Sequence, residues 1–439
     1  MKFFSLFISL FVAIYSASSW ANDDLLTVFE MSLNNDPELL AEAASLRAVN
    51  ELDNQATARF LPQINLSANN GQVRRKSSAE TFGVDAKYNE HGYTLNLTQS
   101  LFRRQNYIQD RQADIAISSA QASYDIAVQA LIVRVAERYF EFLASQDELS
   151  FAVAEKKANG KQLEQVQQRF DIGLATITDL TESQAGYDLA HTAVIRAENV
   201  LANSKERLRE TTGHYFDSLA TLKAKTPLVS PEPAQSEEWV SLALEQNPSL
   251  VVVKKARENA NQVIELQKSD HYPTLDIVGQ TSFNSQSETS FGGSSKTHQD
   301  SISLQVNLPI FQGGDVVSRT REATHRLDQA MQDEEQQRRT VLRQSREAFN
   351  DVMSGISQVK ALKQAVQSNE KALESTEAGY EVGTRTTVDV LNVRRDLFRA
   401  RSDYADARYN YILSSLRLKQ AAGVLEKEDI ALINEWLEK

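Results

Sequence analysis

Two segments of the chain resemble each other: FDIGLATITDL at residues 170–180 and YEVGTRTTVDV at residues 380–390. Each contains one glycine, Gly173 or Gly383, at a position where a residue with left-handed backbone torsions can end a helix. Helix-like apolar periodicity stands on both sides of each segment. We therefore predict that each segment is the turn of a helical hairpin, and that the chain contains two such hairpins.

An aspartate follows each turn glycine, at the expected start of the returning helix. These residues are Asp179, which follows Thr178, and Asp389 in the second turn. The positive end of the helix dipole stabilises a carboxylate there, so both aspartates could serve only as helix caps. A functional role is the alternative, and the residues themselves leave the two interpretations open.

The similarity of the two turns is part of a longer repeat. Two further pairs of segments are separated by 211 residues and a third pair by 209. These pairs are residues 35–39 and 246–250, residues 60–64 and 271–275, and residues 101–102 and 310–311. Chance does not keep nearly one offset over four motifs, so the second half of the chain copies the first.

The repeat predicts how the chain is divided. We expect a first structural repeat at residues 22–226 and a second at residues 237–423, followed by a C-terminal tail at residues 424–439. Between the repeats, residues 227–236 contain three prolines and are predicted to form a linker.

The N-terminus has the pattern of a secretory signal. Lys2 precedes a mostly apolar stretch at residues 3–15, and a run rich in small residues follows, in which Ser19 and Ala21 fit a small-x-small cleavage site. We expect residues 1–21 to be removed by cleavage between Ala21 and Asn22. A membrane anchor is the alternative, but this stretch is shorter than the ~20 apolar residues of a bilayer-spanning helix.

Each repeat also contains two segments with the two-residue period of β-strands. Pro62 and Pro273 disfavour helix at the residue before them, so each is expected to end a helix and precede a strand. The apolar members of the alternation are Ile64, Leu66, Ala68, Tyr93, Leu95, Leu97, Leu275, Ile277, Ile302, Leu304, Val306 and Leu308. Polar loops are expected at residues 71–90 and 282–300.

Four strands of about ten residues have the length of strands that cross a bilayer in a tilted β-barrel. A half-buried strand of a soluble core would show the same alternation, which is the alternative for any one strand. The smallest membrane barrels have about eight strands, and an open strand edge in lipid leaves backbone groups unpaired. The strand count therefore predicts that several chains close one barrel.

Two helical segments of ~70 residues, at residues 102–170 and 311–380, would each be ~100 Å long. Their apolar residues recur every seven positions, which predicts left-handed supercoiling. The stripes are Ile117, Tyr124 and Leu131; Val128, Val135 and Phe142; Leu342, Phe349 and Ile356; Val352, Val359 and Val366; and, in the return helix, Leu397, Tyr404, Tyr411 and Leu418. Taken alone, these heptads also fit a soluble dimeric coiled coil.

The composition argues against several classes of protein. The chain has 47 basic and 59 acidic residues, a net charge of −12, and no Lys/Arg-rich run, so a nucleic-acid partner is not expected. There is no Cys, and the six histidines are scattered singly, so no metal site is indicated. Phosphate-binding, dinucleotide and nucleophile motifs are absent, and we expect neither a cofactor nor an enzyme.

The motif GTRTTVDVL at residues 383–391 and the motif LPIFQGG at residues 308–314 resemble those of the TolC family of outer-membrane channel-tunnels. The resemblance covers nearly all of the chain after the signal. It implies a mainly α protein with a membrane β-barrel portion, in which three chains form a twelve-stranded barrel that continues into a twelve-helix coiled-coil tunnel across the periplasm.

The resemblance also implies a function: a passive exit duct in the outer membrane of a Gram-negative cell, surrounded by outer-membrane lipid. Its implied partners are a periplasmic adaptor and an inner-membrane pump of the RND, ABC or MFS type, in drug efflux or type I secretion. The alternative is a periplasmic coiled-coil adaptor without a barrel. Such an adaptor needs only one hairpin and no lipid-facing strands, so the doubled hairpin and the four strands weigh against it.

In the family, the second hairpin turn bends inward and closes the tunnel. Carried over by residue, Tyr380 and Arg385 would bond with Thr178 and Asp179 of the first turn. Such polar links between the turns would hold the gate closed.

The resemblance also places acidic residues at the narrowest point. Asp389 would supply a ring of three carboxylates there, one from each chain. Asn392 stands where some members of the family have a second acidic ring. The sequence therefore predicts a single ring at this constriction.

Overall fold

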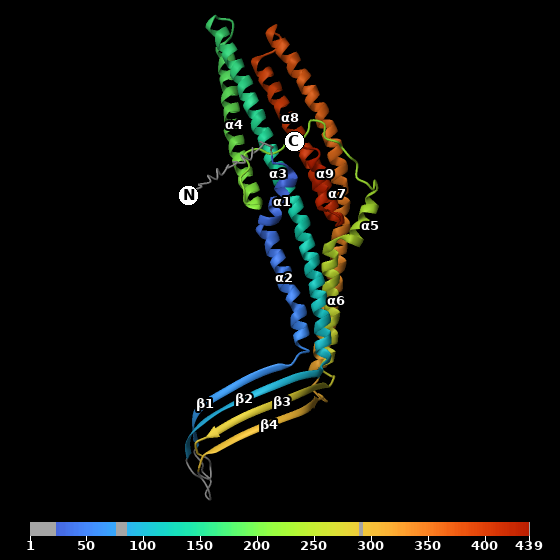
Figure 1. The fold of residues 1–439 in the computed structure, drawn as a ribbon. Helices are drawn as coiled ribbons and strands as arrows, with labels where there is room; N and C mark the ends of the chain where they lie inside the picture. Colours follow the sequence, from blue (N-terminus) through green and yellow to red (C-terminus); the bar gives the residue numbers. More distant parts are fainter. Residues whose placement is uncertain (1–22, 76–85, 289–292, 439) are drawn as a thin grey trace, which may run out of the picture.

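The computed structural model describes residues 23–75, 86–288 and 293–438, which form an elongated body with a sheet at one end and two helical hairpins at the other (Figure 1). The predicted cleavage site between Ala21 and Asn22 lies outside these residues. In the described part of the chain, no helix combines the length and the apolarity needed to cross a membrane.

Both halves of the chain follow the same order of elements, as the repeat predicts, and the second half ends with an additional helix. The first half comprises α1 (Leu25–Asn35), α2 (Pro37–Ala58), β1 (Gln63–Arg75), β2 (Ala86–Phe102), α3 (Arg104–Asp171) and α4 (Ile177–Thr212). The second comprises α5 (Ser236–Gln246), α6 (Pro248–Ser269), β3 (Thr274–Gln286), β4 (Ser295–Asn307), α7 (Asp315–Glu381), α8 (Thr387–Ala422) and α9 (Lys427–Asn434).

The prolines act where the sequence predicts. The strands β1 and β3 begin directly after Pro62 and Pro273, and the helices before them end four residues earlier. Upstream, Asp36 accepts a hydrogen bond from Leu39 N at 2.8 Å, and a proline follows it at the first position of α2. The local sequence therefore sets both boundaries of this helix.

The strands are longer than the sequence predicts, with 13 to 17 residues each. The predicted loops at residues 71–90 and 282–300 are wrong over much of their length, because Gly71 pairs with Glu90 and Ser282 with Gln299. Backbone hydrogen bonds do not depend on side-chain polarity, so the ladder continues where the apolar alternation has ended.

The four strands form one antiparallel sheet in the order β1-β2-β3-β4, and its two faces differ. Directly paired residues share a face. One row across the sheet is Ile64, Leu97, Gly279 and Ile302, and the next row, on the opposite face, is Asn65, Asn96, Gln280 and Ser301. In the single chain the apolar face is open: Ile302 is 82% exposed and Leu304 is 63% exposed.

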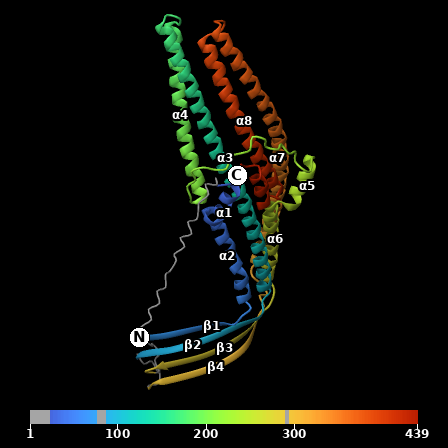
Figure 2. The same cartoon turned by 45° about the horizontal axis from the view of Figure 1, so that its top comes forward.

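The helices α3 and α7 have 68 and 67 residues and run from the sheet to the hairpin tips. They begin slightly later than the sequence predicts, because Phe102 still belongs to β2 and Phe311 precedes α7. Against α3, α2 covers the half near the sheet and α4 the half near the tip, and α6 and α8 do the same for α7 (Figures 1 and 2). Each long helix is therefore paired with another helix along nearly its whole length.

The main hydrophobic core lies near the middle of the long helices, where the predicted heptad stripes meet. Buried stripe residues are Leu131, Val135, Phe142, Phe349, Val352, Ile356, Val359, Tyr411 and Leu418. Other members of the stripes, such as Ile117 and Val366, are only partly buried. The heptad pattern thus identifies the helix faces that pack together, but not how deeply each residue is buried.

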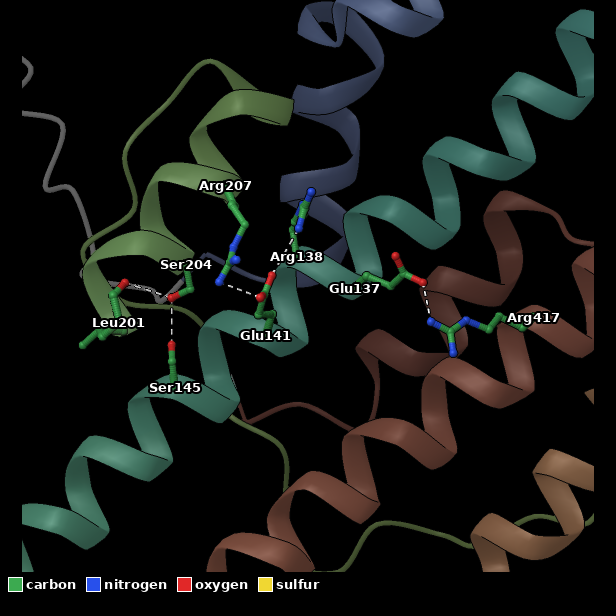
Figure 3. A network of polar contacts seen from close by, with 8 residues as sticks. All are labelled: Glu137, Arg138, Glu141, Ser145, Leu201, Ser204, Arg207 and Arg417. Carbon is green, nitrogen blue, oxygen red and sulfur yellow. Dashed lines mark hydrogen bonds and ion pairs between the residues drawn. The ribbon is translucent and has the colours of Figure 1, made fainter. Parts of the chain in front are cut away.

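Polar side chains tie α3 to both of its neighbours in the same region (Figure 3). The buried hydroxyls of Ser145 on α3 and Ser204 on α4 are 2.7 Å apart. On the other side of α3, an ion pair of 2.6 Å joins Glu137 to Arg417 of α8. The first contact joins the two helices of one hairpin, and the second links the two hairpins to one another.

The segment after residue 423 is not a loose tail. It forms α9, whose Ile430 and Ile433 are buried in the main core, and Leu437 then pairs with Leu222. Asn434 also donates to Asp24 Oδ2 at 2.7 Å, which joins the two ends of the described chain. The connection between the repeats is likewise longer than residues 227–236, since α4 ends at Thr212 and α5 begins at Ser236.

Helix α9 offers a matched test of this packing. Ile430 is 0% exposed and Leu432, two residues later, is 55% exposed. Ile430→Ala should lower the free energy of unfolding by about 2–5 kcal/mol, because it leaves a cavity, whereas Leu432→Ala should change it by less than about 0.5 kcal/mol. Denaturant unfolding measures both. Equal effects of the two substitutions would show that α9 is not part of the core.

Candidate functional site at the hairpin tips

The two hairpin turns have the same backbone geometry. Gly173 and Gly383 have φ of +76° and +77°, in the left-handed region that favours glycine. Both glycines therefore have the left-handed torsions that can end a helix. In the second turn, the carbonyl of Gly379 accepts hydrogen bonds from Thr384 N at 2.8 Å and Arg385 N at 3.2 Å, which closes the end of α7.

Both aspartates of the turns form capping boxes. In the first, Asp179 N donates to Thr176 Oγ1 at 3.1 Å and Asp179 Oδ2 accepts from Thr176 N at 3.0 Å. In the second, Asp389 and Thr386 make the same exchange at 3.2 and 2.9 Å. The capping role that the sequence allowed is therefore present at both positions.

The caps also set the charge of the two carboxyl groups. The hydroxyl and backbone N–H of Thr176 lower the pKa of Asp179 from its ordinary value. The backbone N–H and hydroxyl of Thr386 lower the pKa of Asp389 in the same way. Both side chains are therefore anionic at neutral pH, and Oδ1 of Asp389 has no hydrogen-bond partner among the described residues.

One direct contact joins the two turns. Thr387, which is fully buried at the start of α8, donates from its hydroxyl to Asp179 Oδ1 at 3.4 Å. The Tyr380 ring lies 5.4 Å from the guanidinium of Arg169. Among the described residues, no hydrogen bond or ion pair within one chain joins Tyr380 or Arg385 to Thr178 or Asp179.

A buried arginine connects the helices just beyond the turns. Arg394 of α8 is 7% exposed, and it donates to Glu377 Oε1 of α7 at 2.7 Å and to Asn159 Oδ1 of α3 at 3.3 Å. The amide of Asn159 in turn donates to the carbonyl of Gly186 on α4 at 3.2 Å. These residues link all four helices of the tips, and sequence analysis does not identify them.

A polar cavity of about 610 Å³ lies next to this network, between α3, α7 and α8. Its lining includes Gln162, whose amide nitrogen is buried and has no partner among the described residues. Arg385 and Asn392, by contrast, are exposed at the surface of the tip. The interior of the tip therefore contains buried polar groups beside apolar ones such as Val166 and Val390, whereas the core midway along the helices is mainly apolar.

No reacting group or ion site stands out at the tips. In the ranges 23–75, 86–288 and 293–438, no three His, Cys, Asp or Glu side chains lie close enough together to hold a metal ion. The two carboxylates that sequence analysis singled out, Asp179 and Asp389, instead cap helices. The polar contacts at the tips join the four helices to one another and form no reactive site among the described residues.

The capping boxes make a prediction about local stability. Thr176→Ala removes the hydroxyl that accepts from Asp179 N, and should weaken the first turn of α4 by about 0.5–2 kcal/mol. Thr181→Ala, one turn later, removes an exposed hydroxyl outside the box and is the control. Hydrogen–deuterium exchange of the first-turn amides measures the difference. Equal exchange in the two variants would contradict the role of the box.

The lowered pKa of Asp179 adds a pH dependence. Because the folded pKa lies below the unfolded value, the contribution of the ionised carboxylate is present above ~3.9 and is lost as the pH falls through the folded pKa. In the wild-type chain, the protection of these amides should therefore stay constant from pH 7 to about pH 5 and fall only in more acidic solution.

Comparisons with known proteins identify the family to which the chain belongs. The profile of the outer membrane efflux protein family matches residues 28–214 and 239–424. Outer membrane protein TolC of Vibrio cholerae is 36% identical over 443 residues, which covers 99% of this chain and 98% of that protein. Alkaline protease secretion protein AprF of Pseudomonas aeruginosa is 29% identical, with 93% of this chain and 86% of that protein covered.

Solved structures show the same fold. The CmeC outer membrane channel of Campylobacter jejuni superposes with a TM-score of 0.78, covers 95% of this chain and 90% of its own, and is 17% identical. The two segments matched by the profile hold both hairpins and the whole sheet. The chain is therefore a member of the outer membrane efflux protein family, the TolC family.

Proposed function

We propose that this protein is one subunit of a trimeric outer-membrane exit duct, used in efflux, type I secretion or both. The observation that carries the proposal is the four-stranded sheet, which has an open apolar face, a polar opposite face and two unpaired edges, and which continues directly into the long hairpins. Membership of the outer membrane efflux protein family supports the same function.

Three copies of the sheet would close into one barrel. Each chain offers β1 and β4 as free edges, so joining β4 of one chain to β1 of the next gives twelve strands with every backbone group paired. The apolar face then contacts lipid and the polar face lines a water-filled lumen. The hairpins of the three chains continue this lumen as a helical tunnel across the periplasm.

The duct has no energy source of its own, so it must work with other proteins. We assign it a periplasmic adaptor and an inner-membrane pump of the RND, ABC or MFS type. Both kinds of cargo are supported, since one relative is named for protease secretion and the chain itself belongs to a family named for efflux. The predicted signal, cleaved between Ala21 and Asn22, would direct the chain out of the cytoplasm.

We assign the gate to the hairpin tips. Among the described residues, neither Tyr380 nor the exposed Arg385 is bonded to Thr178 or Asp179 of its own chain, so we assign their bonds to Thr178 and Asp179 of a neighbouring chain. The unbonded Oδ1 of Asp389 would face the axis as one member of a ring of three. Asn392, one helical turn further, would add no second ring of charge.

The two faces of β4 test the barrel. Leu304→Arg on the apolar face should cost about 2–4 kcal/mol near the bilayer midplane and reduce assembly, whereas Gln305→Arg on the polar face should be tolerated. The measurement is the yield of detergent-resistant trimer in the outer-membrane fraction. Wild-type protein recovered as a monomer from the soluble periplasm would refute the duct and favour an adaptor.

The gate is tested by conductance. Moving a closed population from 99:1 to 1:99 takes ~5.5 kcal/mol, and an exposed ion pair supplies only ~0–1 kcal/mol, so three copies of Arg385→Ser should loosen the gate without fully opening it. Single-channel conductance in planar bilayers should rise. The control is Lys371→Ser, an exposed residue of α7 away from the turn.

A crosslinking experiment examines the constriction separately. The chain has no Cys, so Asp389→Cys introduces a single thiol per chain. Disulfides should form between chains in the closed duct. Unchanged conductance of Arg385→Ser together with no crosslink at position 389 would leave the two aspartates with a capping role alone.

A further inference from the structure

The apolar face of the sheet ends in positive charge at the end farthest from the helices. The last apolar row is marked by Tyr93 and Phe283, whose rings stack at 5.8 Å. Beyond it, Lys296 lies in the same row as His91, and further out Arg74 pairs directly with Lys87. By the strand register, all of these side chains stand on the same face as Ile64 and Leu304.

The pair of Arg74 and Lys87 is unusual in its charge. Like charges directly opposite each other on neighbouring strands destabilise a sheet, because their Cβ atoms lie only about 4.5–5.5 Å apart. Both side chains are exposed, and among the described residues neither makes a hydrogen bond or ion pair. The acidic side chain on this face is Asp300, which lies on the other side of the aromatic row and contacts His298 at 3.3 Å.

The position of the pair relative to the membrane follows from the strand geometry. Ile64 and Arg74 are ten residues apart, which is about 34 Å along a strand and about 24 Å across the bilayer at a tilt near 45°. The apolar band of a membrane barrel is ~25 Å tall. With Ile64 at the periplasmic boundary, Arg74 and Lys87 stand at the level of the outer-leaflet headgroups.

We infer that Arg74 and Lys87 form a binding site for a phosphate group of the outer-leaflet lipid, with Lys296 as a further contact on the same face. A phosphate accepts several charge-assisted hydrogen bonds and removes the repulsion between the two cations. The apolar rows below would hold the acyl chains of the same lipid. This inference rests on the proposed function, because it needs the apolar face to point outward in a membrane barrel.

The test compares two triple variants with equal loss of charge. The site variant is Arg74→Gln, Lys87→Gln and Lys296→Gln. The control variant is Lys360→Gln, Lys363→Gln and Lys371→Gln, which changes exposed residues of α7. Detergent-solubilised trimers are titrated with diphosphoryl lipid A, and with phosphatidylcholine as a reference of no net charge, and bound lipid is counted by native mass spectrometry.

Wild-type and control trimers should each bind up to three molecules of lipid A in preference to phosphatidylcholine, and the site variant should bind lipid A at least about tenfold more weakly. Binding should also weaken as salt rises. A trimer whose site variant binds lipid A less than about threefold more weakly would overturn the lipid site and leave the duct intact. Failure of the wild-type chain to form a trimer would overturn both.

Discussion

The rest of this structure depends on one constraint: a strand placed in lipid must be paired along both edges. The sheet pairs β1 with β2, β2 with β3 and β3 with β4, and the outer edges of β1 and β4 have no partner in the described chain. An apolar face as open as this one would also be unstable in water. Trimerisation satisfies both requirements at once, and it fixes the three-fold arrangement of the hairpins that follow.

The architecture was largely predictable because the sequence repeats the same series of helices and strands in its two halves. Proline positions fixed where strands begin, and a seven-residue period fixed which helix faces pack. The strand ends were wrong because residues 69–72, Asn-Asn-Gly-Gln, carry no apolar signal although they pair fully with β2. Helix α9 was missed because eight residues are too few for a periodic pattern, and its burial depends on a distant core.

At the hairpin tips, too, some features could be predicted from the sequence and others could not. Capping by Asp179 and Asp389 was readable from the sequence because it involves residues three positions apart. The contacts of Thr387 with Asp179 and of Arg394 with Asn159 join residues more than 200 positions apart. A single sequence gives no signal for such pairs, so the residues that connect the two hairpins emerged only from the structure.

The distribution of apolar residues favours the hairpin tips as the part of the proposed duct that moves. Midway along the helices, large side chains such as Tyr139, Phe142 and Leu131 are fully buried, and separating helices there would expose them. Towards the tips, the separate apolar cluster is small, Ala152, Val194 and Ala197, and the rest of the interior combines smaller apolar side chains such as Val166 and Val390 with buried polar ones such as Gln162 and Arg394. Hydrogen bonds and ion pairs there can be exchanged for water at a net cost of about 1 kcal/mol each. In the proposed duct the hairpins would therefore be held more firmly at their centres than at their ends, and this difference would let a partner protein open the tips without unfolding the tunnel.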